Sequence, residues 1–496
     1  MTHIDKDLAS IQKARDLCNQ AREAMRSFQF ASQEEVDRVC EAMVEAAVAE
    51  AARLGQLAHE ETGFGFPLHK KLKNEFASRN VWEYIKDTPT CGVLHHDKER
   101  KIVEIGAPVG VVVALTPSTN PTSTAIFKSL ISVKARNAVI VAPHPSASKS
   151  TAEAVRVIAE AGERAGMPAG LISCLENPTI QGTTELMSHY ATSMILATGG
   201  PGMVKAAHSQ GKPALGVGPG NVPAYVDRSA HVVKAARMIV ESKSFDCSTI
   251  CATEQAVIAD RPIAERLKAE MQAHGAHWLT KEEADKLAAV MFRPNGMMVA
   301  GLVGRTPQYI AKKVGIQVPE TARILVADLE GIGPDHPLSR EKLTTVLGFM
   351  VVDGWREGCD RAIDMLTFGG DGHSIVVHSR DEEAVLTFGI EKPAFRILVN
   401  TWGCLGGVGY TTGLAPSLTL APGGVGGAAV SDNITLTHVL NVKRLAYHLR
   451  DAPEVAKLWG GRGSAPASAQ ATSNDPGQDA IDRIVAQVLA EMRGTS

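Results

Sequence analysis

Apolar residues in the first half of the chain follow two alternating patterns. Short runs that are apolar at nearly every position alternate with longer segments in which apolar residues recur at helical spacing. The runs occupy residues 110–115, 138–142, 172–175 and 193–197, and the helical segments include residues 122–133, 149–165 and 183–188. Wholly apolar strands separated by helices are typical of a parallel sheet covered on both faces. The pattern predicts an α/β fold whose ligands bind beyond the carboxyl ends of the strands.

Helical spacing also predominates before this region. Residues 6–61 and 70–86 are rich in helix formers and predict a series of helices, after which a polar turn separates two β-like runs at residues 91–94 and 101–105. This arrangement predicts a hairpin over about residues 91–105. His95 and His96 lie near its end, and because the nearby sequence offers no third ligand, we expect a solvated hairpin end and no metal site.

The pattern divides the chain into five parts. We expect N-terminal helices and a dinucleotide-binding domain over residues 1–228, a second α/β domain over 229–430, a return to the first region over 431–459, a linker over 460–477 and a helix over 478–496. Strands of the second domain are expected at residues 346–352, 374–378 and 397–400. Glycine is dense in residues 401–433, which predicts either close approach of backbone to a ligand or a pair of long surface loops.

Composition excludes several classes of protein. The 496 residues allow roughly two to four domains. A hydrophobic content of 44%, a charged content of 21% and a net charge of −3 indicate a soluble globular protein without broad affinity for nucleic acid or anionic membranes. No run reaches the ~18 apolar residues of a membrane span, and the first residues do not resemble a secretory signal. Eight cysteines without a C-x-x-C pair fit free thiols in a reducing cytoplasm.

Four segments, considered in their order along the chain, indicate catalytic chemistry. They are Thr-Pro-Ser-Thr-Asn-Pro at residues 116–121, Gly-Val-Gly-Pro-Gly-Asn-Val-Pro at 216–223, Ser-Phe-Asp-Cys-Ser-Thr-Ile-Cys-Ala-Thr-Glu-Gln at 244–255 and Leu-Ala-Pro-Ser-Leu-Thr-Leu at 414–420. Each is weak alone, since a free cysteine is most often a small buried hydrophobe. Together they resemble the CoA-acylating branch of the aldehyde dehydrogenase superfamily over roughly residues 5–455.

The resemblance implies a fold and two catalytic residues. The fold would have a Rossmann-like cofactor domain that lacks the usual G-x-G-x-x-G fingerprint, a second α/β catalytic domain, and a small oligomerisation arm formed by the hairpin. Cys251 would be the nucleophile, with Cys247 as a structural or secondary thiol. Asn120, with a backbone N–H at the cysteine, would hold the developing oxyanion. A free thiol titrates near 8.5, so the thiolate requires local lowering of its pKa or proton loss linked to substrate binding.

The resemblance also implies the residues that bind the cofactor. Thr116 and Pro117 follow the first strand, while His144 and Pro145 follow the second and would line the adenosine side. Thr198, Gly199 and Gly200 precede a helix whose N-terminus suits a pyrophosphate. Gly218 lies in the glycine-proline loop, and Glu341 matches the family glutamate that orients the nicotinamide ribose. An acidic residue near residues 142–146 would bind the ribose hydroxyls and exclude a 2′-phosphate, but the family's lysine and glutamate are both absent there. We expect NAD, with NADP as the alternative.

One departure from hydrolytic relatives predicts the fate of the acyl group. Those enzymes carry a glutamate that activates the deacylating water, whereas residues 213–226 contain no acidic residue. Coenzyme A would therefore accept the acyl group in a reversible step. We expect propionaldehyde as the first choice of substrate and acetaldehyde as the second. The alternatives are a hydrolytic, CoA-independent aldehyde dehydrogenase and a non-catalytic scaffold of the same fold.

The C-terminal segment predicts a docking element. Apolar residues recur there at steps of three and four, at Ile481, Ile484, Val485, Val488, Leu489 and Met492. After a flexible linker, this short amphipathic helix resembles the encapsulation peptides of bacterial microcompartment cargo enzymes, and residues 478–496 would bind shell or cargo proteins. The alternative is a helix that folds back on its own core. We expect a homodimer or homotetramer, located in the cytoplasm and inside a microcompartment.

Overall fold

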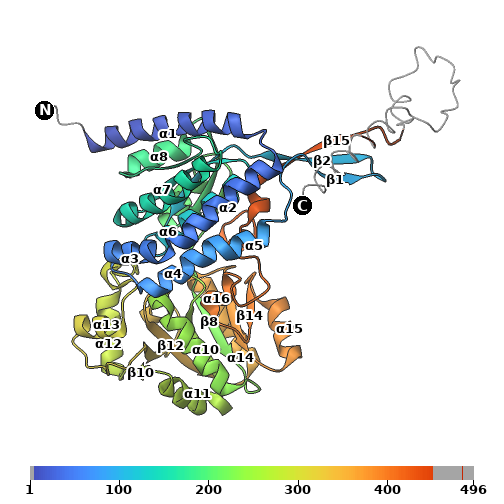
Figure 1. The fold of residues 1–496 in the computed structure, drawn as a ribbon. Coiled ribbons are helices and arrows are strands. Elements are labelled where there is room, and N and C mark those ends of the chain that lie inside the picture. The colour runs from blue at the N-terminus through green and yellow to red at the C-terminus, as the bar shows by residue number, and fades with distance from the viewer. Residues whose placement is uncertain (1–4, 451–482, 484–496) are drawn as a thin grey trace, which may run out of the picture.

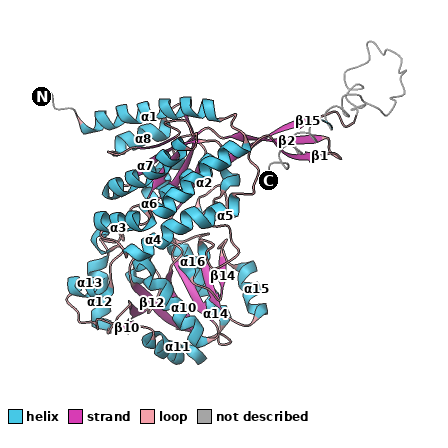
Figure 2. Cartoon of the chain, viewed as in Figure 1, coloured by secondary structure: helices cyan, strands magenta, loops and turns pink. Residues whose placement is uncertain are grey.

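The computed structural model describes residues 5–450 and residue 483. Strands form three sheets within these residues, and helices cover the two larger ones (Figure 1, Figure 2). The α/β class with parallel sheets, expected from the apolar runs, is confirmed.

The first sheet is parallel and has five strands in the order β5-β4-β3-β6-β7. Its strands are β3 (Val111–Thr116), β4 (Ala138–Pro143), β5 (Ile172–Cys174), β6 (Thr192–Thr198) and β7 (Ala214–Val217). In the middle of the sheet Leu115 is aligned with Ala142 on one side and Ala197 on the other. Every residue of β3 and β4 is buried because helices cover both faces, which explains why these runs carry no polar alternation.

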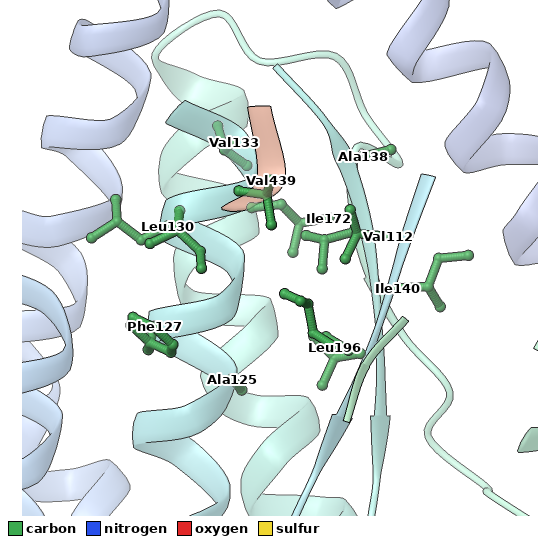
Figure 3. Packing of buried hydrophobic residues seen from close by; sticks show 14 of the residues in the cluster. Val112, Ala125, Phe127, Leu130, Val133, Ala138, Ile140, Ile172, Leu196 and Val439 are labelled. Atoms are coloured by element: carbon green, nitrogen blue, oxygen red, sulfur yellow. The ribbon is translucent and has the colours of Figure 1, made fainter. Parts of the chain in front are cut away.

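The helices of this first unit are α1 (Lys6–Phe28), α2 (Gln33–Ala49), α3 (Ala51–Thr62), α6 (Pro121–Lys134), α7 (Ser148–Arg164), α8 (Ile180–Ser188) and α9 (Pro201–His208). Helix α6 is buried at all its positions, between the sheet and outer helices that include α2 and α4. Phe127 and Leu130 of α6 belong to the same cluster as Val112 and Leu196 of the sheet (Figure 3). The buried Lys128 ammonium donates to the carbonyl oxygens of Leu115 (2.7 Å) and Leu196 (2.8 Å).

The second sheet is also parallel and has seven strands in the order β10-β11-β12-β9-β8-β13-β14. The strands are β8 (Val222–Val226), β9 (Glu254–Asp260), β10 (Ala276–Trp278), β11 (Ile324–Asp328), β12 (Val346–Val352), β13 (Ile375–His378) and β14 (Ile397–Val399). Alternate residues of β9 belong to two different hydrophobic clusters. Val257 and Ala259 pack with α10 (Val232–Ser244) and α11 (Arg261–Ala273), while Ala256 and Ile258 pack with α14 (Trp355–Gly369).

The remaining helices of the second unit are α12 (Lys281–Met291), α13 (Pro307–Val314), α15 (Glu382–Glu391) and α16 (Gly403–Gly407). Local signals fix several helix starts. A reciprocal pair between Thr280 and Glu283 begins α12, and a similar pair between Ser32 and Glu35 begins α2.

The expected boundary between the two α/β units at residue 228 is wrong by one strand. Residues 222–226 form β8, which pairs with β9 and β13 in the second sheet, so the chain crosses between the sheets before Val222. Two features hide this crossing in the sequence. The strand is short and contains Pro223, and it directly follows a Gly-Pro-Gly turn that is typical of a loop.

The hairpin extends away from both units (Figure 1). Strands β1 (Val93–Asp97) and β2 (Ile102–Pro108) are antiparallel, and β15 (Leu440–Ala446) joins them by pairing with β2. The arm is therefore a three-stranded sheet to which the C-terminal region contributes one strand.

Helix α4 (Pro67–Glu75) lies between the two α/β units (Figure 1). It continues through a π-helical turn (Phe76–Asn80) into α5 (Val81–Ile85), so the helix expected over residues 70–86 is interrupted by one wide turn. Helix α4 contacts α3 and α6 of the first unit and the turn Phe245–Ser248 of the second.

Candidate active site

The cysteine segment, residues 244–255, contains an unusual turn. Between the end of α10 and the start of β9, three consecutive residues have left-handed backbone: Asp246 (φ 46°), Cys247 (φ 52°) and Ser248 (φ 63°). This conformation costs an L-residue about 1–2 kcal/mol, so surrounding contacts must hold it. The turn precedes Cys251, whose side chain is partly exposed, whereas Cys247 is fully buried.

Helix α4 supplies the contacts that hold this turn. The Asp246 carboxylate accepts the Phe66 N–H (2.8 Å) and the ammonium groups of Lys70 (3.2 Å) and Lys73, while the Asp246 N–H donates to His69 Nδ1 (2.8 Å). Burial raises the pKa of Asp246, but the two ammonium groups outweigh it and hold the pKa at about 2. Asp246 is therefore a buried anion that ties the cysteine segment to α4.

Asn120 lies beside the same segment. It occupies the N-cap position of α6, directly before Pro121, at the carboxyl end of β3. Its Nδ2 group donates to the carbonyl oxygen of Thr249 (2.9 Å) and to Thr119 Oγ1 (3.2 Å). The amide nitrogen is thus bonded to the backbone two residues before Cys251.

The Cys251 thiol is protonated at neutral pH in this arrangement. Burial raises its pKa to about 12, and the Glu341 carboxylate adds to the effect, whereas Arg396 and the backbone N–H groups of Cys251 and Ala252 oppose it. The groups that lower the pKa are therefore outweighed. Of the two expected routes to a thiolate, this arrangement favours proton loss linked to substrate binding.

Glu341 faces the same cavity as Cys251. Its Oε1 accepts the N–H of Gly220 (2.8 Å), which places the glutamate against the glycine-proline loop. Burial raises its pKa to about 7, opposed by the Gly220 N–H and by Lys243 and Lys342. Residues 213–226 contain no acid, but the fold brings one into the pocket from a distant part of the chain.

The sequence-predicted residues meet in two adjoining cavities. A cavity of about 260 Å³ is lined by Pro117, Asn120, His144, Thr198, Gly199, Gly200, Gly218, Cys251 and Glu341. A smaller cavity of about 100 Å³ includes Thr116 and Pro145 and shares several of the same residues. Both lie beyond the carboxyl ends of β3, β4 and β6, where a parallel sheet binds its ligands. The structure thus brings every predicted site residue to one region.

Sequence reasoning missed the apolar walls of these cavities. The larger one is closed by Ile250, Val303, Leu343, Val408, Leu418 and Leu420, and the smaller one by residues that include Ile180, Thr183 and Met203. Val408, Leu418 and Leu420 come from the glycine-dense segment 401–433. Of the two alternatives for that segment, the structure therefore supports close approach to the ligand cavity.

Sequence reasoning also missed His373. A Cβ placed on Gly220 would lie 3.0 Å from the His373 ring and 2.3 Å from the Cys251 carbonyl oxygen, so all three groups are close. His373 Nδ1 lies 3.0 Å from Ser374 Oγ, which accepts from Arg396 Nε (3.2 Å). Burial lowers the pKa of His373, so the ring is neutral beside the cysteine segment.

Neither a metal site nor a membrane-spanning helix is found among the described residues. Within residues 5–450 and 483, no group of three or more His, Cys, Asp or Glu side chains is placed to hold a metal ion. In the same part of the chain, every helix is too short or too polar to cross a membrane.

Known proteins share this architecture. Residues 5–291 match the aldehyde dehydrogenase family. Aldehyde-alcohol dehydrogenase 2 of Entamoeba histolytica is 42% identical over 84% of this chain and 49% of its own length. An acetylating aldehyde dehydrogenase from Geobacillus thermoglucosidasius is 48% identical, with a TM-score of 0.90 over 91% of this chain and 100% of that one. A Rhodopseudomonas palustris propionaldehyde dehydrogenase, solved with bound CoA and an acylated cysteine, is 25% identical, with a TM-score of 0.80 over 88% and 97% of the two chains.

The chain belongs to the aldehyde dehydrogenase family, as the resemblance of its motifs implied. It spans about half the length of the first curated relatives that it matches. The aldehyde dehydrogenase-like fold expected from the sequence is confirmed by the two solved structures.

Replacing Glu341 tests the electrostatics of the thiol. We expect Glu341→Gln to speed alkylation of Cys251 by iodoacetamide at pH 8 by about three- to tenfold, because removing a nearby negative charge lowers the pKa of a thiol. The difference should shrink at pH 6, since the Glu341 pKa of about 7 leaves the wild-type carboxyl mostly neutral there. Quantifying the alkylated Cys251 peptide by mass spectrometry, with Glu99→Gln as the control, measures this. Slower alkylation of the Gln variant would contradict the assignment.

Proposed function

We propose that the protein catalyses the NAD-dependent, CoA-acylating oxidation of a short-chain aldehyde to its acyl-CoA. One observation carries this proposal: a thiol and an amide donor face a single cavity at the carboxyl end of the parallel sheet. Cys251 supplies the nucleophile, and Asn120 is fixed beside it by its hydrogen bond to Thr249. A thiol with an adjacent oxyanion donor is suited to acyl chemistry.

The nucleotide fits the residues that surround the two cavities. Helix α9 begins at Pro201 after Gly200, and a Cβ at Gly200 or Gly202 would meet no atom within 4 Å. Its first N–H groups would hold a pyrophosphate, while Ile180 and Met203 would enclose the adenine. Glu341 and His144 would contact the two riboses. A bound NAD supplies the hydride acceptor. NAD is preferred over NADP on the sequence alone.

The chain's own residues define the steps. The Cys251 sulfur attacks the aldehyde carbonyl and forms a thiohemiacetal, whose oxyanion the Asn120 amide and the Cys251 N–H stabilise. After hydride loss the acyl group is a thioester on Cys251. The sulfur of CoA then attacks this thioester, releasing acyl-CoA and the Cys251 thiol. The Rhodopseudomonas palustris structure, which holds an acylated cysteine and CoA, supports this route by analogy.

The substrate is a small aldehyde. The side walls of the larger cavity are apolar, formed in part by Ile250, Leu343 and Leu418, which suits a short alkyl group. The resemblance to microcompartment enzymes makes propionaldehyde the first choice and acetaldehyde the second, whereas the more similar of the two solved relatives is named an acetylating enzyme. Since one methylene changes binding by only about 1–3 kcal/mol, we expect both aldehydes to react.

Glu341 favours a second candidate function. A carboxyl group with a pKa of about 7 in the pocket of the nucleophile is suited to activate water, which would release a free acid. Its hydrogen bond to Gly220 and its family role in binding ribose argue against this use. The hydrolytic alternative therefore ranks second. The scaffold alternative ranks last, because the predicted catalytic residues share one cavity.

The product and its dependence on CoA decide between the first two candidates. We expect steady NADH formation from propionaldehyde or acetaldehyde only when CoA is present, with acyl-CoA as the product in chromatography. Without CoA, NADH formation should stop after about one turnover, because the thioester cannot be discharged. Steady NADH formation and free carboxylic acid without CoA would contradict the proposal. If that activity also disappeared in Glu341→Gln, the hydrolytic candidate would replace it.

Three further predictions go beyond the site. The encapsulation-type helix over residues 478–496 lies outside the described residues except for residue 483, as does the linker, so docking to shell or cargo proteins stays a prediction. Location inside a microcompartment depends on that docking. A homodimer or homotetramer, built through the three-stranded arm, is likewise proposed from the family resemblance.

A further inference from the structure

Two lysines of helix α4 are buried at the centre of the protein. Lys70 is 2% exposed and Lys73 is 3% exposed, although long charged side chains are rarely buried unless they are paired. Both approach the Asp246 carboxylate, and Asp246 is itself fully buried. Two ammonium groups and one carboxylate leave an unbalanced positive charge in a region that excludes water.

The contacts of Lys73 differ from those of Lys70. The Lys73 ammonium donates to Asn120 Oδ1 (2.5 Å), to Thr249 Oγ1 (3.1 Å) and to Asp246. All three of its N–H groups therefore have acceptors. Lys70 instead donates to the carbonyl oxygen of Thr119 (3.2 Å) and to Asp246. It therefore contacts the backbone next to Asn120, whereas Lys73 contacts the Asn120 side-chain amide.

The contact with Lys73, together with the Thr249 carbonyl that accepts from the amide nitrogen, fixes which end of the Asn120 amide faces the cysteine segment. An ammonium group only donates hydrogen bonds, so the amide oxygen must point toward Lys73 and the amide nitrogen must point away. The nitrogen then donates one N–H to the Thr249 carbonyl, and its other N–H, which donates to Thr119 Oγ1 here, would turn to the substrate oxygen. In the opposite orientation the amide oxygen would face the oxyanion and repel it.

We propose that Lys73 is a positioning residue that holds the Asn120 amide in the one orientation able to donate to the oxyanion. Asp246 in turn holds Lys73 in place and ties it to the left-handed turn before Cys251. Helix α4 thus orients both parts of the site, the amide and the cysteine segment. The inference rests on the proposed function, because it assumes that Asn120 stabilises an oxyanion.

A double-mutant cycle separates positioning from general support of the fold. We expect Lys73→Met to lower kcat for aldehyde oxidation about 10- to 100-fold with little change in KM, since the donor would act mainly in the transition state. In an Asn120→Ala background the same substitution should change kcat less than about threefold, because no amide is left to orient. Equal losses in both backgrounds would overturn the inference. Single-turnover NADH formation keeps the slow variants measurable.

Two controls address stability. Lys70→Met removes an equally buried charge from the same carboxylate, and we expect a similar fall in Tm but a smaller loss of kcat. Lys71→Met, on the exposed side of α4 where Lys71 pairs with Glu75, should leave both unchanged. A loss of kcat in Lys70→Met as large as in Lys73→Met would overturn the specific role of Lys73.

A third variant allows the same test if Lys73→Met does not fold. Lys73→Gln keeps a neutral donor on a side chain one bond shorter, so it should retain more activity than Lys73→Met. If only Lys73→Gln folds, its effect on kcat should show the same dependence on Asn120. An equal loss from Lys73→Gln with and without Asn120 would overturn the inference. If Asn120→Ala alone left kcat unchanged, the oxyanion role in the proposed function would fail first, and the role of Lys73 with it.

Discussion

Replacing Cys251 with alanine is expected to abolish aldehyde oxidation. In the proposed mechanism the sulfur forms the covalent bond on which both half-reactions depend, and the described residues that line the cavity include no second cysteine. Losses of about 10⁴-fold or more in kcat/KM are usual when a covalent nucleophile is removed. The folded protein should survive, because the cysteine side chain is small, partly exposed to the cavity and without a partner that would be left buried and charged.

Cys247 provides the matched control. It lies four residues earlier and is fully buried, so substrate cannot reach its sulfur. Burial raises the pKa of both thiols to about 12, so accessibility is what distinguishes them. We expect Cys247→Ala to keep kcat/KM within a few-fold of wild type. Incubation with aldehyde and NAD without CoA should leave an acyl group on the Cys251 peptide in mass spectrometry. An active Cys251→Ala, or acylation of Cys247 instead, would contradict the assignment.

The central part of the fold could be predicted because burial there leaves a simple pattern. Strands β3 and β4 are covered on both faces, so they are apolar at nearly every position and stand out between helices. The sequence does not reveal strand β8, because its five residues follow a Gly-Pro-Gly turn and include Pro223. Which sheet such a strand joins depends on pairing with β9 and β13, which lie about 30 and 150 residues further along the chain and are not visible locally.

The residues of the candidate site also differ in how far the sequence reveals them. The short motifs that carry the family resemblance predicted that Cys251 and Asn120 belong to one site, and both line the same cavity. The residues that support them could not be predicted in this way. Lys70 and Lys73 occur in the run Lys-Lys-Leu-Lys, which is typical of the solvated face of a helix. Only their partner Asp246, more than 170 residues away, explains why both are buried.

Glu341 illustrates the limit of arguing from an acid-free segment. The absence of acidic residues over 213–226 is a fact of the sequence, but a pocket is assembled from many segments. The fold brings Glu341 to Gly220 of that segment from 121 residues away. Whether water is activated therefore depends on where this carboxyl points when nucleotide is bound. That is why the product assay, and not the motif, decides between the two candidate functions.

Asn120 gives the second large expected effect. Removing one oxyanion donor typically costs about 10²–10³ in kcat, or about 2.7–4 kcal/mol, and we expect a loss of this size for Asn120→Ala. The KM for aldehyde should change little, because the donor acts on charge that develops only in the transition state. Initial-rate kinetics with saturating NAD and CoA measure both parameters.

Asn120→Asp is the sharper variant because it keeps the shape of the side chain. Its carboxylate can still accept from Lys73 but can no longer donate to the Thr249 carbonyl, so we expect a modest fall in Tm. Yet it offers no N–H to the substrate and puts negative charge where the oxyanion forms, so kcat should fall at least as far as in Asn120→Ala. A variant of the same size, with its contact to Lys73 intact, then fails through the missing donor and the added negative charge, and not through a change of shape. If Asn120→Asp instead retained near wild-type kcat, the amide would be a structural cap of α6 and the oxyanion would have to be stabilised by backbone N–H groups alone.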